Sequence, residues 1–120
     1  MGELTLAYEA HATSTGIPAR AVCSARNQFW VCDDSGSGGA AGAGEFFCAS
    51  ISGCAVNLVG RIAAAENRSF GWIEVRTGAY RDMDKTASDV TLYDAVRVAF
   101  ELWEVREDDA EYLVKAWKQR

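Results

Sequence analysis

The chain has 120 residues, the usual length of one domain with one hydrophobic core, and we expect a single domain over residues 1–120. A net charge of −5, with no cluster of lysine and arginine before the last few residues, argues against nucleic acid as a partner. The acidic N-terminus is unlike a signal peptide and we expect no bilayer-spanning run, so we expect a cytoplasmic protein with no membrane partner.

The first third of the chain predicts three short strands. Residues 4–13 alternate apolar and polar side chains with the period of a half-buried strand. Residues 14–19 hold a glycine and the only proline, so the chain should turn there. Residues 20–25 and 28–32 have the composition of two further strands, joined near Asn27, a residue type that tolerates left-handed turn geometry. We expect a small antiparallel meander.

The longest helix-compatible run extends from Gly44 to Asn67, after a glycine-rich loop at residues 33–44. Apolar residues lie on most sides of this helix, and such a helix is typically buried. Its polar side chains therefore need partners, and we look for function among them. They are Glu45, Cys54, Asn57 and Arg61.

The last third predicts two paired strands and a helix. Residues 72–80 alternate as a strand with Ile73, Val75 and Thr77 on one face, residues 82–89 should form a hairpin loop, and residues 92–102 alternate again. Residues 107–120 begin with acids and end with bases, which matches the helix dipole. The apolar stripe of this helix comprises Ala110, Leu113, Val114 and Trp117. The order of elements predicts an α+β fold.

Four cysteines occur in the chain, and without a secretion signal we expect reduced thiols. They are Cys23, Cys32, Cys48 and Cys54. No pair has the two-residue separation of a zinc knuckle, and the one histidine, His11, is far from them in sequence, so we expect no metal and no cofactor. Cys48 and Cys54 are six residues apart, too far along one helix for a disulfide.

Glu45 and Cys54 are nine residues apart, which places them about 180° apart around a helix and roughly 13–14 Å apart along its axis. They cannot meet on one unbroken helix. If they act together, either Glu45 serves a thiol on another chain or the helix begins after it. The first alternative favours a symmetric homodimer.

A thiol becomes a nucleophile when a cation stabilises its thiolate, and a carboxylate can orient that cation. Arginine suits this role because its planar fork can bind both partners. The candidates are Arg20 and Arg26 on the early strands and Arg61 on the helix face of Cys54. A cysteine in a small-residue helix is also compatible with inert packing, so the residues alone leave both interpretations open.

The run GAGEFFCASISGCAVNLVGRIAAAEN resembles the core of the osmotically inducible protein C and organic hydroperoxide resistance family (OsmC/Ohr). The segments RTGAYRD, DAVRVAFELWEV and EDDAEYLVKAWKQR resemble the later strands and the last helix of that family. The resemblance implies the OsmC-like fold, an intertwined homodimer with active sites between subunits. It implies that Cys54 is the peroxidatic cysteine and Glu45 the acid. The family's arginine comes from the early strands, which points to Arg20 or Arg26.

The function implied by the resemblance is a thiol-dependent peroxidase that reduces organic hydroperoxides or hydrogen peroxide in oxidative-stress defence, with an external thiol as reductant and no cofactor. Family members that reduce peroxides have a second cysteine soon after the point that corresponds to Arg120, and the 120 residues do not include it. Either the chain has been shortened relative to its relatives, or this member works without the usual resolving thiol. Cys23 or Cys32 could replace that thiol, although packing is the simpler role for strand cysteines, and an external thiol could also complete the cycle. The alternatives are a non-catalytic dimeric domain that binds a small apolar ligand between subunits, a shortened family member without peroxidase turnover, and a hot-dog-like thioesterase with Glu45 as base.

Overall fold

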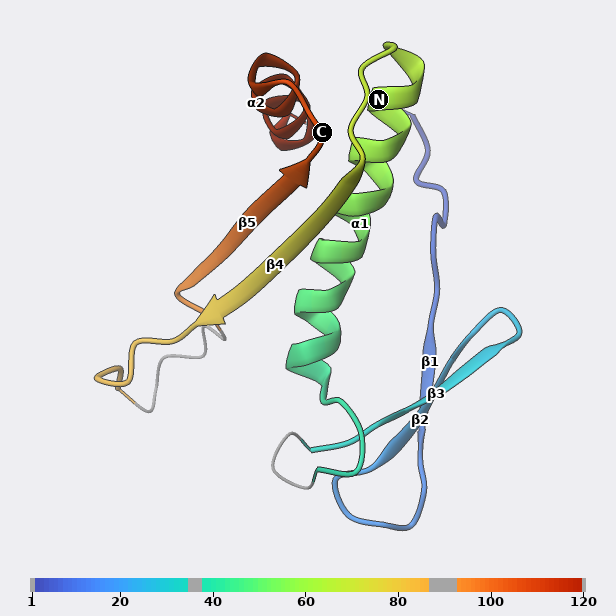
Figure 1. Ribbon diagram of the computed structural model, residues 1–120. Helices are drawn as coiled ribbons and strands as arrows, with labels where there is room; N and C mark the ends of the chain where they lie inside the picture. Colours follow the sequence, from blue (N-terminus) through green and yellow to red (C-terminus); the bar gives the residue numbers. More distant parts are fainter. Residues whose placement is uncertain (1, 35–37, 87–92, 120) are drawn as a thin grey trace. The chain divides into compact units, whose positions relative to one another are not determined.

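The computed structural model describes residues 2–34, 38–86 and 93–119, and these form seven elements (Figure 1). In chain order they are β1 (His11–Ser14), β2 (Ala21–Ala25), β3 (Gln28–Cys32), α1 (Ala43–Ala65), β4 (Trp72–Tyr80), β5 (Ala95–Trp103) and α2 (Glu107–Lys118). This order confirms the expected α+β arrangement. The chain divides into two compact units, Met1–Phe46 and Phe47–Arg120, and α1 begins in the first and continues through the second. The single domain over residues 1–120 stays a prediction.

The first unit contains an antiparallel sheet with the strand order β1-β2-β3, the expected meander. The first strand is shorter than expected: residues 4–10 are exposed coil, and pairing begins at His11 opposite Ser24. A strand needs a neighbouring strand to bond with, and only four residues of β1 pair with β2. The turn between β2 and β3 places Arg26, and not Asn27, at a positive φ of 54°. Two-residue hairpins commonly require this at their first central position.

The second unit contains the predicted pair of long strands. β4 and β5 pair antiparallel along their full length, from Trp72 opposite Trp103 to Tyr80 opposite Ala95. The expected alternation on β4 is confirmed, since Ile73, Val75 and Thr77 are half-buried. The predicted start of β5 at Leu92 and the end of the predicted hairpin loop, residues 87–89, lie outside the described residues.

The hydrophobic core cluster lies in the second unit. Its buried members come from α1 and α2, and partly buried side chains of β4 and β5 pack against them. Within this cluster the ring of Phe100 meets that of Trp117 edge to face at 5.1 Å. The predicted apolar stripe of α2 accounts for this packing, with Leu113 fully buried. The buried members of the cluster are Val59, Ile62, Ala63 and Leu113.

Helix α1 is less buried than its composition predicted. Only Ala55, Val59, Ile62 and Ala63 are buried along it, and much of the remaining surface is exposed. The expectation that no run could span a bilayer is also wrong on length and composition, because α1 is long and apolar enough to do so. One such helix is weak evidence for a membrane span, since core helices of soluble proteins pass the same test.

Candidate functional site

Cys54 lies in the middle of α1 with its side chain exposed. The other three cysteines, Cys23, Cys32 and Cys48, are half-buried, and all four are free thiols. The thiol that the sequence singled out is therefore the one that a dissolved molecule reaches most easily.

At 100° per residue, Phe47, Ser50, Asn57 and Arg61 lie on the same side of α1 as Cys54. These four residues are exposed. Arg61 follows Cys54 by seven residues, two turns or roughly 10 Å along the axis, so its guanidinium must reach back toward the N-terminus of the helix to approach the thiol. Side chains of helices do lean in that direction.

Glu45 belongs to the first turn of α1, because the helix begins at Ala43. Its Oε1 accepts a hydrogen bond from the backbone N–H of Gly42 at 3.0 Å. This is the reverse half of a capping box, in which the third helical residue satisfies the amide just before the helix. The alternative that the helix begins after Glu45 is therefore wrong. Glu45 and Cys54 share one continuous helix, on opposite sides of it.

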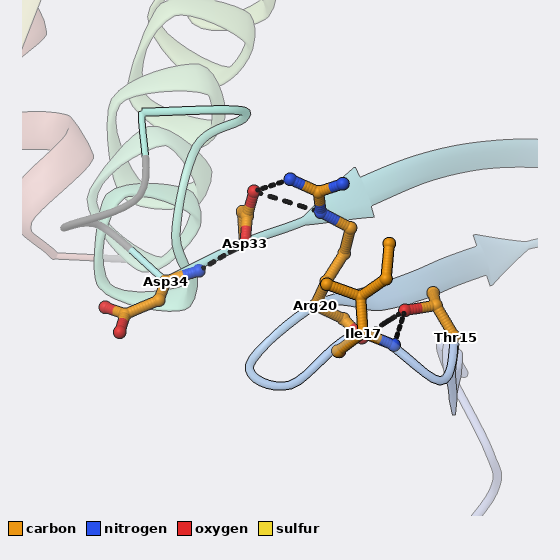
Figure 2. Close-up of polar contacts among 5 residues, drawn as sticks. All are labelled: Thr15, Ile17, Arg20, Asp33 and Asp34. Carbon is orange, nitrogen blue, oxygen red and sulfur yellow. Dashed lines mark hydrogen bonds and ion pairs between the residues drawn. The ribbon is translucent and has the colours of Figure 1, made fainter.

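Arg20 is held by a carboxylate that the sequence analysis did not identify, that of Asp33 (Figure 2). The Asp33 Oδ2 accepts from Arg20 Nε at 3.2 Å and from a terminal guanidinium nitrogen at 2.9 Å. The Asp33 side chain is 3% exposed and that of Arg20 is 35% exposed. Asp33 Oδ1 also accepts from the N–H of Asp34 at 2.9 Å. A buried carboxylate needs this complement of donors, and Arg20 supplies its counter-charge.

The hairpin register contained the signal that could have identified this pair. Ala21 lies opposite Cys32, so the next position along the ladder places Arg20 opposite Asp33. Gly39 lies directly against the ion pair, since a Cβ on it would be 2.6 Å from Asp33 Oδ2 and 2.8 Å from a guanidinium nitrogen of Arg20. A larger residue would therefore displace one of the charged groups.

Arg26 is exposed in the β2–β3 turn. Arg20 and Arg26 flank opposite ends of β2, a strand of five residues and about 17 Å. The two candidate arginines therefore lie at opposite ends of the sheet and cannot act at the same site within it.

A cavity of about 300 Å³ in the second unit is lined by a different thiol, that of Cys48. Charged side chains of β4 and β5, Glu74, Arg76 and Glu101, line it as well. At its edge the hydroxyls of Ser52 and Thr77 are hydrogen-bonded at 2.7 Å and link α1 to β4. The cavity thus offers a thiol, a guanidinium and carboxylates together. Cys48 was not among the predicted site residues, and its spacing from Cys54 only excluded a disulfide between them.

Metal binding was not expected from the spacing of His11 and the cysteines. Within residues 2–34, 38–86 and 93–119, no group of three or more His, Cys, Asp or Glu side chains is placed to hold a metal ion. The absence of a resident metal or cofactor stays a prediction.

Comparison with known proteins identifies the fold. No family model and no curated protein matches the sequence. The structure is similar to the crystal structure of an OsmC like protein from Mycoplasma pneumoniae, with a TM-score of 0.83 over 98% of this chain and 84% of that chain. This chain has the OsmC-like fold. The resemblance inferred from the sequence is thereby confirmed for the fold, whereas at 10% identity the roles of Cys54, Glu45 and the arginines stay predictions.

Proposed function

We propose that this OsmC-like chain is a thiol-dependent peroxidase that reduces organic hydroperoxides or hydrogen peroxide through Cys54. The observation that carries the proposal is the exposed Cys54 thiol on the central helix of an OsmC-like fold, where the other cysteines are half-buried. The family that the sequence resembles is associated with peroxidase activity. The role in oxidative-stress defence and the cytoplasmic location belong to the same proposal.

The proposed reaction uses two thiols of an external reductant. The Cys54 thiolate attacks the peroxide oxygen, the O–O bond breaks, and the cysteine becomes a sulfenic acid. The leaving oxygen takes up a proton and departs as an alcohol from an organic hydroperoxide, or as water from hydrogen peroxide. A first reductant thiol attacks the sulfenic sulfur and releases water, forming a mixed disulfide. A second reductant thiol then displaces Cys54 and completes a reductant disulfide. No cysteine beyond Arg120 is required for this cycle.

A homodimer is part of the proposal because Glu45 and Cys54 lie on opposite sides of one continuous helix. Glu45 of one subunit would serve the thiol of the other across a two-fold axis. The large exposed surface of α1, an apolar helix, supports such an interface, because a second copy would remove it from water. Phe47, 41% exposed on the same side as Cys54, is one of the side chains that pairing would cover.

The test is turnover of cumene hydroperoxide with a dithiol reductant by the unmodified protein, by Cys54→Ser and by Cys48→Ser. Cys54→Ser should lose turnover, because serine cannot form the sulfenic acid. Cys48→Ser is the matched control on the same helix and should retain most of it. If turnover survives in Cys54→Ser and disappears in Cys48→Ser, the reactive thiol is Cys48 and not Cys54.

The assisting arginine is tested by glutamine substitutions at Arg20, Arg26 and Arg61. The one that assists the thiolate should lower kcat/KM and raise the pH at which Cys54 becomes reactive toward iodoacetamide. Arg20→Gln also breaks the Asp33 ion pair, so its activity has to be compared with that of Asp33→Asn. If Asp33→Asn lowers kcat/KM as much as Arg20→Gln does, Arg20 acts by holding Asp33 and the loop that follows β3, and not by assisting the thiolate.

The second candidate function is binding of a small apolar ligand without turnover. An open groove of about 660 Å³ between β5 and α2 favours it, because most of its lining residues are apolar: Val98, Phe100 and Leu102 from the strand and Ala110 and Val114 from the helix. Glu111, Lys115 and Lys118 of α2 line it as well. Fluorescence titration with an apolar probe distinguishes the two. Saturable binding lost in Val114→Asp, in a protein without peroxide turnover, would favour the binding function.

A further inference from the structure

The sheet of the first unit brings two half-buried cysteines to one face, Cys23 on β2 and Cys32 on β3. Cys23 lies opposite Trp30 and Cys32 lies opposite Ala21, so the two thiols are diagonal neighbours across the strand pair. Side chains two residues apart on a strand share a face, which places both thiols on the same side of the sheet. The nearby Cys23 contributes to a raised pKa of the Cys32 thiol.

The surroundings of this thiol pair favour the neutral form of Cys32. Removal from water is the largest cause of its raised pKa, followed by Cys23 and then by the carboxylate of the next residue, Asp33. The same face carries Trp30, whose ring meets that of Phe46 at a centroid distance of 6.3 Å and so provides apolar cover beside the pair.

We propose that Cys23 and Cys32 are a second oxidisable site, a dithiol that organic hydroperoxides convert to a disulfide within the sheet, independently of Cys54. One thiolate attacks the peroxide oxygen, the O–O bond breaks, the alcohol leaves, and a sulfenic acid forms. The other thiol attacks that sulfur, the S–O bond breaks, and water leaves with the proton. The dithiol loses two electrons and the peroxide gains them. A dithiol reductant reverses the change.

Closing the disulfide requires the two strands to shift slightly. Diagonal neighbours in an antiparallel pair are further apart at Cβ than a disulfide accepts. The Cβ atoms of Cys23 and Cys32 therefore have to approach each other before the bond can form. Ala21, directly opposite Cys32, leaves room for this because its side chain is small. The next ladder position holds the ion pair of Arg20 and Asp33, so the oxidised sheet should show a disturbed ion pair.

The test uses the double variant Cys48→Ser/Cys54→Ser, which retains only Cys23 and Cys32 among the four cysteines. Treatment with cumene hydroperoxide should remove both alkylatable thiols and lower the intact mass by two hydrogen atoms, with the chain still a single polypeptide on a non-reducing gel. Dithiothreitol should restore both thiols. Adding Cys23→Ser or Cys32→Ser should abolish the mass loss and leave a thiol that gains oxygen instead.

A gain of one or more oxygens without loss of two hydrogens in the double variant would overturn the proposal, as would a disulfide between chains. In the unmodified protein, trypsin followed by cleavage at glutamate separates Cys23, Cys32 and the two helix cysteines into different peptides, with cuts after Arg20, Arg26 and Glu45. The linked peptides should be those of Cys23 and Cys32. Because the double variant lacks Cys54, the result is independent of whether Cys54 supports turnover.

Discussion

The two units of the chain are stabilised in opposite ways. In the second unit the most buried side chains are apolar, with Leu113 and Val59 fully removed from water. In the first unit the most buried side chain among the described residues is a carboxylate, that of Asp33, and residues 2–19 are exposed throughout. Hydrophobic burial is non-directional and tolerates small shifts, whereas a buried charge depends on each of its donors. The first unit is therefore sensitive to single polar changes, and the second to loss of volume.

The largest expected effect lies in the apolar core of the second unit. Leu113→Ala should lower the free energy of unfolding by about 2–5 kcal/mol, because it removes a fully buried side chain and leaves a cavity. Urea denaturation followed by circular dichroism measures the change. Glu111→Ala, an exposed position on the same helix, is the control and should stay within about 0.5 kcal/mol. Equal effects at both positions would show that α2 does not pack as described.

The corresponding change in the first unit is Arg20→Gln, which removes the Arg20 ion pair of the buried Asp33. We expect a loss of about 1–3 kcal/mol, because Arg20 is partly exposed and water can replace some of its hydrogen bonds. Asp33→Asn in the same background should recover part of this loss, since no buried charge then remains. The double-mutant cycle over these two residues measures their coupling, and additive effects would contradict a direct ion pair.

A smaller effect is expected at the beginning of α1, where the two units meet in the chain. Glu45→Ala removes the acceptor for the Gly42 amide and a negative charge from the helix N-terminus, so stability should fall by about 1 kcal/mol. Glu45→Gln keeps an acceptor oxygen and should cost less. Thermal denaturation of both variants checks the order. If neither variant is less stable than the unmodified protein but both lose peroxide turnover, the carboxylate acts in chemistry and not as a cap.

The smallest expected change is a gain in stability at Arg26. Its positive φ of 54° is unfavourable for any side chain with a Cβ, so Arg26→Gly should raise the free energy of unfolding by up to about 1 kcal/mol. Arg26→Lys keeps the strain and the charge, and serves as the control in the same thermal assay. Destabilisation by glycine would mean that the arginine side chain makes contacts that outweigh the backbone strain.

Several features could be predicted from local pattern. The alternation in residues 72–80 predicted β4 with its half-buried face, and the charge order of the last segment predicted α2, because both depend on near neighbours in sequence. The run around Cys54 predicted α1 to within about two residues at each end. The separation of Glu45 and Cys54 on one helix was also foreseeable, since it is a consequence of helix geometry.

Contacts between residues distant in sequence could be seen only in the folded chain. The order of amino acids was enough to predict the seven elements and the OsmC-like resemblance, since these are encoded in periodicity and in one contiguous run. It could not show that Arg20 is held by Asp33, that Cys48 lines a cavity, or that Cys23 and Cys32 are diagonal neighbours on one face of the sheet. Those contacts depend on strand register and on how helix and sheet pack, and a shift of one residue in register would have separated each of the strand pairs.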